Sequence, residues 1–328
     1  MRRCRVVRME QLYRLIGSDM AAVDAVIRQR LHSEVALVRQ VAEYIVQSGG
    51  KRLRPALVLL SAGAMAYRGA HHHELAAVVE FIHTATLLHD DVVDGSDLRR
   101  GRETANAMFG NSASVLVGDF LYSRAFQMMV TVNDMRIMRV LSDATNVIAE
   151  GEVLQLMNCH DAGIDEDGYL QVIRYKTAKL FEAAAQLGAI IGGGAAVVEQ
   201  GMATYGLHLG TAFQLIDDVL DYSGAELETG KHLGDDLAEG KPTLPLIFVL
   251  RNGNPEQAAC VRRAIQTGGR DDFPEVLAAI RETGALDYAR QKAQVEAELA
   301  AAALDVVPAS QYKDSLLELC LFAVARNY

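Results

Sequence analysis

Apolar positions along the chain recur at helical rather than strand spacing. In the segment 74–94, Leu75 is three, four and seven residues before Val78, Val79 and Ile82, which places all four on one face of an amphipathic helix. Comparable patterns predict helical segments over residues 9–47, 112–131, 134–158, 167–191 and 198–222, and shorter ones from residue 242 to the C-terminus. Because no segment alternates polar and apolar residues as a strand does, the sequence predicts an all-α fold.

Glycine and proline mark the ends of these predicted helices rather than domain borders. Gly49–Gly50, Gly192–Gly194 and Gly268–Gly269 separate helical segments, and the six prolines lie at helix edges or in loops. We therefore expect residues 1–328 to form one domain, a single large helical bundle, in which 1–34 are an N-terminal helical region outside the motifs described below. The polar segment 223–242 is long for a loop inside a compact domain, and loops of that length are often functional.

Composition and charge exclude several classes of protein. The formal net charge is −10, so no nucleic-acid partner is expected, although a local cluster of basic residues would still suit a small anionic substrate. The four cysteines show no C-x-x-C spacing and are predicted to be reduced, buried thiols, as in a cytoplasmic protein. The N-terminal residues contain no apolar h-region, so no secretory signal is expected. No uninterrupted apolar run of 18 residues is present, so no membrane span is expected.

A run of three histidines, His71–His73, follows Gly69. We expect it in a solvated surface loop, with a metal site as the alternative.

Two aspartate clusters share the spacing D-D-x-x-D. The first contains Asp90, Asp91 and Asp94, and the second contains Asp217, Asp218 and Asp221. Within each cluster the first and third carboxylates share a helix face and repel each other, and a nearby helix C-terminus adds to that cost. One such cluster alone is usually a solvated helix face. Two clusters, each preceded by apolar residues, predict a site in which Mg²⁺ ions hold a diphosphate, because Mg²⁺ binds carboxylate and phosphate oxygens together.

Basic residues accompany both clusters. Lys51, Arg52 and Arg54 lie in "GGKRLRP" at a predicted helix start, where glycine permits close backbone approach and the helix N-terminus favours anions. Others are Arg99, Arg100, Lys176, Lys231 and Lys241. Basic groups in several parts of the chain, together with two metal-binding clusters, indicate two anionic substrates rather than one.

Five segments resemble the trans-isoprenyl diphosphate synthases. They are "GGKRLRP", "FIHTATLLHDDVVDGSDLRRG", "RYKTAKLF", "FQLIDDVLDY" and "GDDLAEGKPTLP", which occur in the order of that family and extend from about residue 35 to 325. The segment "FIHTATLLHDD" most resembles the long-chain members of the family, which include the synthases of octaprenyl chains. The resemblance implies the isoprenoid-synthase type of helical bundle around a deep apolar tunnel.

The resemblance also implies roles for individual residues. Mg²⁺ would be held by Asp90, Asp94, Asp217 and Asp221. The diphosphate of isopentenyl diphosphate would be held by Lys51, Arg54, His83 and Arg100. The allylic diphosphate would be held by Arg99, Lys176, Thr177, Gln214, Lys231 and Lys241. Catalysis would depend on Asp90, Asp94, Arg99, Lys176, Asp217 and Lys231. Glu152 and Gln155 would support the metal shell.

The implied reaction joins isopentenyl diphosphate head to tail to an allylic diphosphate, farnesyl or geranylgeranyl, and makes a long all-trans polyprenyl diphosphate, octaprenyl for a quinone side chain. The implied enzyme is a homodimer that contacts the membrane transiently to release its product. Members often end in basic residues, whereas this chain ends in "ARNY", which leaves the contacts of the C-terminal tail open.

Product length must be limited by a steric floor. Each buried CH₂ of the growing chain contributes about 0.8 kcal/mol, so apolar burial alone favours continued growth. Thr86 lies four residues before Asp90 on the same helix face, Ile82 lies one turn further, and the resemblance points to Ala85 as a length-setting position. The sequence leaves open whether seven, eight, nine or ten isoprene units are joined.

Two other functions remain as alternatives. A class I terpene cyclase shares the fold and the first acidic motif, but it binds one diphosphate and normally has a second metal motif that mixes Asn or Asp with Ser or Thr and Glu. A non-catalytic partner subunit of a heteromeric synthase would be expected to have lost acids or the Arg99–Arg100 pair, and neither is lost.

Overall fold

The computed structural model describes residues 9–47, 50–99, 101–223 and 233–326. Most of these residues are helical, which confirms the predicted all-α fold. The N-terminal half contains α1 (Met9–Leu15), α2 (Gly17–Arg30), α3 (Ala36–Gln47), α4 (Leu53–Ala64), α5 (His71–Val93), α6 (Ala105–Phe109), α7 (Asn111–Val132) and α8 (Met135–Asn158). The C-terminal half contains α9 (Glu166–Ile173), α10 (Lys179–Ile191), α11 (Ala196–Ser223), α13 (Asp235–Ala238), α14 (Leu244–Asn252), α15 (Pro255–Thr267), α16 (Phe273–Thr283), α17 (Ala285–Ala303) and α18 (Gln311–Ala325).

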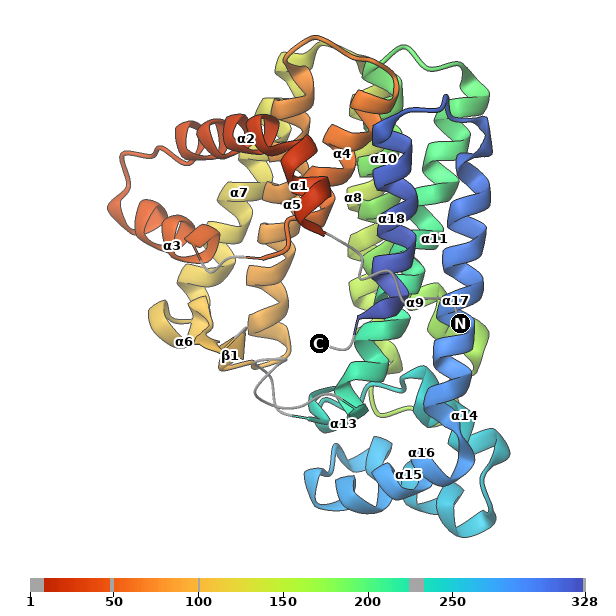
Figure 1. The fold of residues 1–328 in the computed structure, drawn as a ribbon. Coiled ribbons are helices and arrows are strands. Elements are labelled where there is room, and N and C mark those ends of the chain that lie inside the picture. The colour runs from red at the N-terminus through yellow and green to blue at the C-terminus, as the bar shows by residue number, and fades with distance from the viewer. Residues whose placement is uncertain (1–8, 48–49, 100, 224–232, 327–328) are drawn as a thin grey trace.

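The long helices stand side by side and form the body of the molecule (Figure 1). Helix α5 packs along α7, α10 packs between α4 and α11, and α11 packs along α17. The largest cluster of buried apolar side chains runs through these helices and includes Phe81, Phe181 and Tyr205. Helices α2 and α3 lie against α5 and α7, whereas α15 and α16 lie across one end of the bundle (Figure 1).

The predicted single helical segment 9–47 is wrong in one respect, because it forms three helices that turn at Ile16 and again after Leu31. A straight helix of that length would extend about 58 Å and could not stay on the core. The turns let α2 bury Val23 and Ile27 while α3 buries Val41. The predicted helices over 112–131, 134–158 and 198–222 agree with α7, α8 and α11 to within two residues at each end.

Two local features were not predicted. The segment 167–191 is not one regular helix, because a π-helical turn at Arg174–Ala178 separates α9 from α10. A short antiparallel pair of strands, β1 (Leu98–Arg99) and β2 (Arg102–Glu103), follows α5. Of the polar segment 223–242, residues 224–232 lie outside the described residues, and the remainder contains α13.

The expectation of a solvated loop at His71–His73 is wrong. Helix α5 begins at His71, and α2 covers this end of it, so that the imidazoles of His72 and His73 face Asp19 of α2. Only His71 is exposed. The helical period of α5 therefore extends three residues further toward the N-terminus than its apolar residues indicate.

The cysteine prediction holds only in part. Cys320 is buried, whereas Cys159, the capping residue at the end of α8, and Cys260, in the middle of α15, are only partly buried; all three are free thiols. Cys4 lies outside the described residues. In the part of the chain that the structure describes, no helix combines the length and the apolar composition that crossing a membrane requires.

Candidate active site

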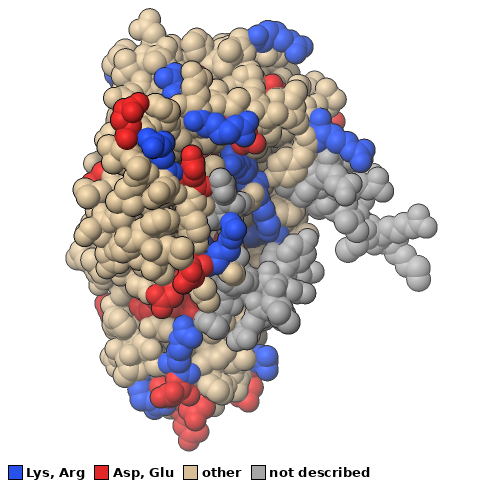
Figure 2. All heavy atoms as spheres, turned by 90° about the vertical axis from the view of Figure 1, so that its left-hand side faces the viewer, with Lys and Arg blue, Asp and Glu red and all other residues tan. Residues whose placement is uncertain are grey.

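Both aspartate clusters border one cavity of about 850 Å³. The predicted residues that line it are Lys51, Arg54, His83, Thr86, Asp90, Asp94, Arg99, Glu152, Gln155, Lys176, Thr177, Gln214, Asp217, Asp221 and Lys241. The predicted residues Arg100 and Lys231 lie outside the described part of the chain. On the face shown in Figure 2, basic side chains gather toward the middle with acidic side chains close to them.

The first cluster ends α5, with Asp94 in the capping position after Val93, and the second lies in the last two turns of α11. Carboxylates at helix C-termini are unfavourable, and nearby cations offset that cost. The ammonium Nζ of Lys241 lies 3.1 Å from a carboxylate oxygen of Asp94, and Arg326 lies 2.7 Å from one of Asp217. These opposite charges lie far apart in the sequence, so only the folded chain brings them together.

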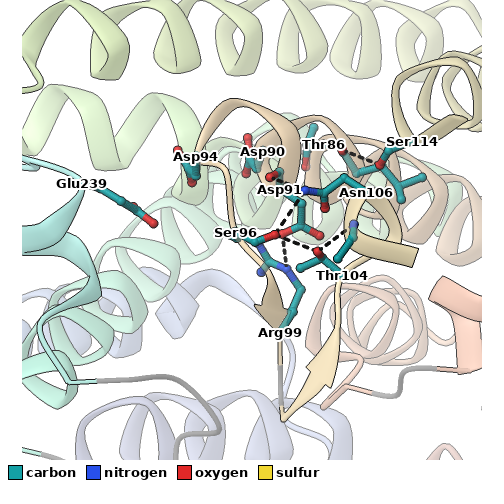
Figure 3. Close-up of polar contacts among 12 residues, drawn as sticks. Thr86, Asp90, Asp91, Asp94, Ser96, Arg99, Thr104, Asn106, Ser114 and Glu239 are labelled. Atoms are coloured by element: carbon teal, nitrogen blue, oxygen red, sulfur yellow. Dashed lines mark hydrogen bonds and ion pairs between the residues drawn. The ribbon is translucent and has the colours of Figure 1, made fainter. Parts of the chain in front are cut away.

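The middle acid of the first cluster has a different role from its neighbours. Asp94 lies on the side of Glu239, whereas the fully buried Asp91 points toward Arg99 (Figure 3). Arg99 donates from Nε to Oδ1 of Asp91 over 2.8 Å, and a second guanidinium nitrogen lies 2.7 Å from the same oxygen. Asp91 therefore holds Arg99, a predicted diphosphate ligand, at the wall of the cavity.

The turn that follows α5 is fixed by side chains. The amide of Asn106 donates to the backbone carbonyls of Asp91 and Ser96, and the hydroxyl of Thr104 donates to the carbonyl of Ser96 (Figure 3). These bonds satisfy carbonyls at the end of the helix and set the direction in which the chain leaves toward Arg99.

Lys176 lies in the π-helical turn and reaches the first cluster. Its Nζ is 2.6 Å from Glu152 and 3.5 Å from Asp90. Burial works to lower the pKa of Lys176, but the two carboxylates outweigh it and the pKa is raised, so the ammonium stays charged. Burial also raises the pKa of Glu152 to about 7, against the opposing effect of Lys176.

A glycine lets the π-helical turn approach α8 closely. A Cβ on Gly151 would lie 2.7 Å from the backbone nitrogen of Lys176, closer than packed atoms allow. Gly151 precedes Glu152, so the same close approach brings Lys176 to its acidic partner. Single π-helical turns occur often at functional sites, because they redirect side chains within a helix.

The second cluster is held by a chain of hydrogen bonds. The Tyr169 hydroxyl donates to Asp218 over 2.5 Å, the Gln214 amide donates to the other oxygen of Asp218 over 2.8 Å, and the Thr177 hydroxyl donates to Gln214 over 3.0 Å. Burial, with a contribution from Asp236, raises the pKa of Asp218 to about 8. The predicted residues Thr177 and Gln214 are thus joined to the aspartates of α11.

The residues predicted to hold isopentenyl diphosphate gather at the start of α4 and along α5. A guanidinium nitrogen of Arg54 lies 3.1 Å from Nε2 of His83, and the guanidinium stacks over Phe181 with 4.5 Å to the ring centroid. The ammonium of Lys51 lies 5.3 Å from the centroid of Phe322. Cations on aromatic faces are held in place without losing their charge, so this group forms a second basic wall.

The three proposed length-setting residues are placed differently. Thr86 borders the cavity, whereas Ala85 and Ile82 are fully buried in the packed core and do not line it. The proposed continuation of the tunnel wall from Thr86 to Ile82 is therefore not open in the described structure. The effect of these residues on product length stays a prediction.

Sequence reasoning missed two residues of the site. Arg326 is buried, lies 2.7 Å from Asp217 and donates to the carbonyl of Phe213 over 2.6 Å. Its basic character in the C-terminal "ARNY" is a signal that could have identified it. Tyr169 has no such signal, because only the packing of α9 on α11 brings it to Asp218.

The residues present fit a divalent cation that prefers oxygen ligands. Asp90, Asp94, Asp217 and Asp221 offer only hard oxygen donors, and three of these carboxylates already attract a cationic side chain. Within the described residues the two clusters do not converge into a three-ligand cage. A hard divalent cation held by one or two carboxylates completes its shell with water and substrate phosphates.

An all-α bundle with two facing aspartate clusters and two basic walls defines a prenyltransferase that acts on diphosphates. The chain belongs to the polyprenyl synthetase family, whose sequence model matches residues 35–281. It is 53% identical over 320 residues to octaprenyl diphosphate synthase of Escherichia coli, covering 97% of this chain and 99% of that protein.

Solved structures agree with this assignment. The polyprenyl synthase of Caulobacter crescentus, solved with calcium and isoprenyl diphosphate, superposes with a TM-score of 0.94 at 46% identity and covers 97% of this chain and 98% of its own. A decaprenyl diphosphate synthase of Rhodobacter capsulatus superposes with a TM-score of 0.92 at 44% identity, covering 97% of this chain and 99% of its own.

Proposed function

We propose that the protein condenses isopentenyl diphosphate with an allylic diphosphate, farnesyl or geranylgeranyl, and repeats the step to make all-trans octaprenyl diphosphate for a quinone side chain. The observation that carries this proposal is the single cavity bordered by both aspartate clusters and by two separate basic groups. Two basic groups suit two diphosphate substrates, which a terpene cyclase does not need. The similarity to octaprenyl diphosphate synthases supports the product length.

The residues of this chain divide the work between the two substrates. Lys176 and Lys241 stabilise the negative charge that develops on the allylic diphosphate as its C–O bond breaks, and Arg99 assists from the wall of the cavity. Arg54 and His83 hold isopentenyl diphosphate so that its double bond faces the allylic carbon. The new C–C bond forms, and a proton then leaves the condensed product for the departed diphosphate.

Magnesium bound by Asp90, Asp94, Asp217 and Asp221 would supply further positive charge to the leaving diphosphate. Apolar and aromatic side chains exclude water, which would otherwise capture the allylic cation. Phe181, Phe213 and Val172 line the cavity for this purpose.

We also propose that the protein works as a homodimer. Helices α7 and α8 carry exposed apolar side chains, which are Val115, Leu116, Val130, Met135, Val153, Leu156 and Met157. Exposed apolar side chains in this number are typical of a surface that another protein covers. We further propose that this homodimer is located in the cytoplasm. It would contact the membrane transiently to release its product.

The proposed function is tested by incubating the purified chain with farnesyl diphosphate, isopentenyl diphosphate and Mg²⁺. The expected product is a series of linear polyprenyl diphosphates that ends at eight isoprene units, read by mass spectrometry. A cyclic hydrocarbon would favour the terpene cyclase, and elongation only after addition of a second protein would favour the partner subunit.

A further inference from the structure

Two imidazoles and one carboxylate converge at the end of α5 that is remote from the aspartates. Nε2 of His73 lies 3.0 Å from Oδ1 of Asp19, and Nε2 of His72 lies 3.5 Å from the same oxygen. All three donor atoms lie within 4.8 Å of one another. The two rings are nearly in contact, with 3.9 Å between their centroids.

These distances match the edges of a metal coordination polyhedron. Ligand atoms about 2.0–2.1 Å from a tetrahedral Zn²⁺ ion lie about 3.3 Å apart. The two pairs that include Asp19 already have this spacing. The two imidazole nitrogens lie within 4.8 Å of each other, so the third edge needs to shorten by at most about 1.5 Å to match a tetrahedral site.

The surroundings favour a site rather than a chance contact of surface side chains. The side chains of His72 and His73 are only 12% and 21% exposed, whereas Asp19 is 31% exposed and leaves a path from solvent. Tyr67 packs against the ring of His72 with its edge, which restricts the orientation of that ring. Rigid, partly buried donors lose little freedom when they bind an ion.

We propose that Asp19, His72 and His73 bind a divalent transition metal of the Zn²⁺ class, with water completing the coordination. Two imidazoles and one carboxylate are a donor set of open zinc sites. Mg²⁺ is a poor occupant, because it prefers oxygen ligands. The site therefore selects a different metal from the one that the aspartate clusters suit.

The site is separate from the cavity. His72 and Asp90 are 18 residues apart in α5, which corresponds to about 27 Å along the helix. Metal bound here cannot touch a substrate held at Asp90. It would instead fasten α2 to α5, alongside the ion pair between Arg30 and Glu74 at 3.0 Å.

The chain provides a matched control for a test. His71 belongs to the same histidine run but is exposed and lies outside the cluster. The full-length protein is stripped with a chelator, dialysed into a large excess of Mg²⁺ to occupy the aspartate clusters, and titrated with ZnCl₂ by calorimetry. We expect one Zn²⁺ per chain and a rise in the melting temperature on binding.

Loss of one donor should remove this binding. His73→Ala and the nearly isosteric Asp19→Asn should each weaken Zn²⁺ binding by at least about tenfold and abolish the thermal shift, whereas His71→Ala should bind as the wild type does. Absence of Zn²⁺ binding in the wild type would overturn the proposal, as would unchanged binding in both His73→Ala and Asp19→Asn. Equal loss in His71→Ala would also overturn it, because the metal would then lie on the exposed side of the run.

Discussion

Arg326 offers a sensitive test of the electrostatics of the cavity. Its guanidinium lies 2.7 Å from Asp217, donates to the Phe213 carbonyl, and lies 3.5 Å from the centroid of the Phe213 ring. A cation that binds Asp217 must compete with this guanidinium. Arg326→Met keeps an apolar stem against Phe213 and removes the charge, so we expect the free enzyme to bind Mg²⁺ more tightly.

The size of the effect follows from burial. The Arg326 side chain is 4% exposed, but that of Asp217 is 42% exposed, so solvent screens their interaction. The free energy of this ion pair is therefore taken as that of a solvent-exposed pair. Such pairs contribute at most about 1 kcal/mol, which corresponds to about a fivefold change in affinity. A roughly fivefold gain in Mg²⁺ affinity is therefore the largest change expected from the loss of this ion pair.

The assay is a calorimetric titration of Mg²⁺ into the protein without substrates. Arg263→Met is the matched control, because it removes an exposed guanidinium that lies 2.9 Å from Asp272 on the surface. This control should leave the Mg²⁺ affinity unchanged. Equal or weaker Mg²⁺ binding by a correctly folded Arg326→Met protein would refute the idea that Arg326 competes with the metal.

Three other predictions concern the reaction. Asp90→Ala should lower turnover by orders of magnitude at saturating Mg²⁺ while circular dichroism shows an intact fold, because a metal ligand is lost; near-normal turnover would contradict the two-cluster site. Arg54→Ala should mainly raise the KM for isopentenyl diphosphate, whereas Lys176→Ala should mainly raise the KM for the allylic substrate. Each substrate is titrated separately, and equal effects of one substitution on the two KM values would count against this division of the basic residues. Thr86→Phe should shorten the main product in chromatography, whereas Thr86→Val, which keeps the volume, should not; an active Thr86→Phe enzyme with a product of full length would remove Thr86 as the upper gate.

The positions of the long helices and the motifs of the site can be predicted from short segments of the sequence alone. The helical period of apolar residues determines the long helices, and the spacing of Asp90 and Asp94 places both carboxylates on one helix face. Glycine pairs mark where helices end. The order of the motifs identifies the family, because each motif is a short contiguous segment that needs no knowledge of its neighbours.

Other features depend on how helices pack, which no local period encodes. Arg326 meets Asp217 across 109 positions in the sequence, Tyr169 meets Asp218 across 49, and His73 meets Asp19 across 54. Each contact depends on the crossing of two helices and on side-chain orientation at that crossing. The turns in segment 9–47 have the same origin, since burial of apolar faces on a curved core outweighs the continuation of a straight helix. The tertiary structure therefore decided which charges meet, whereas the sequence determined which residues could carry them.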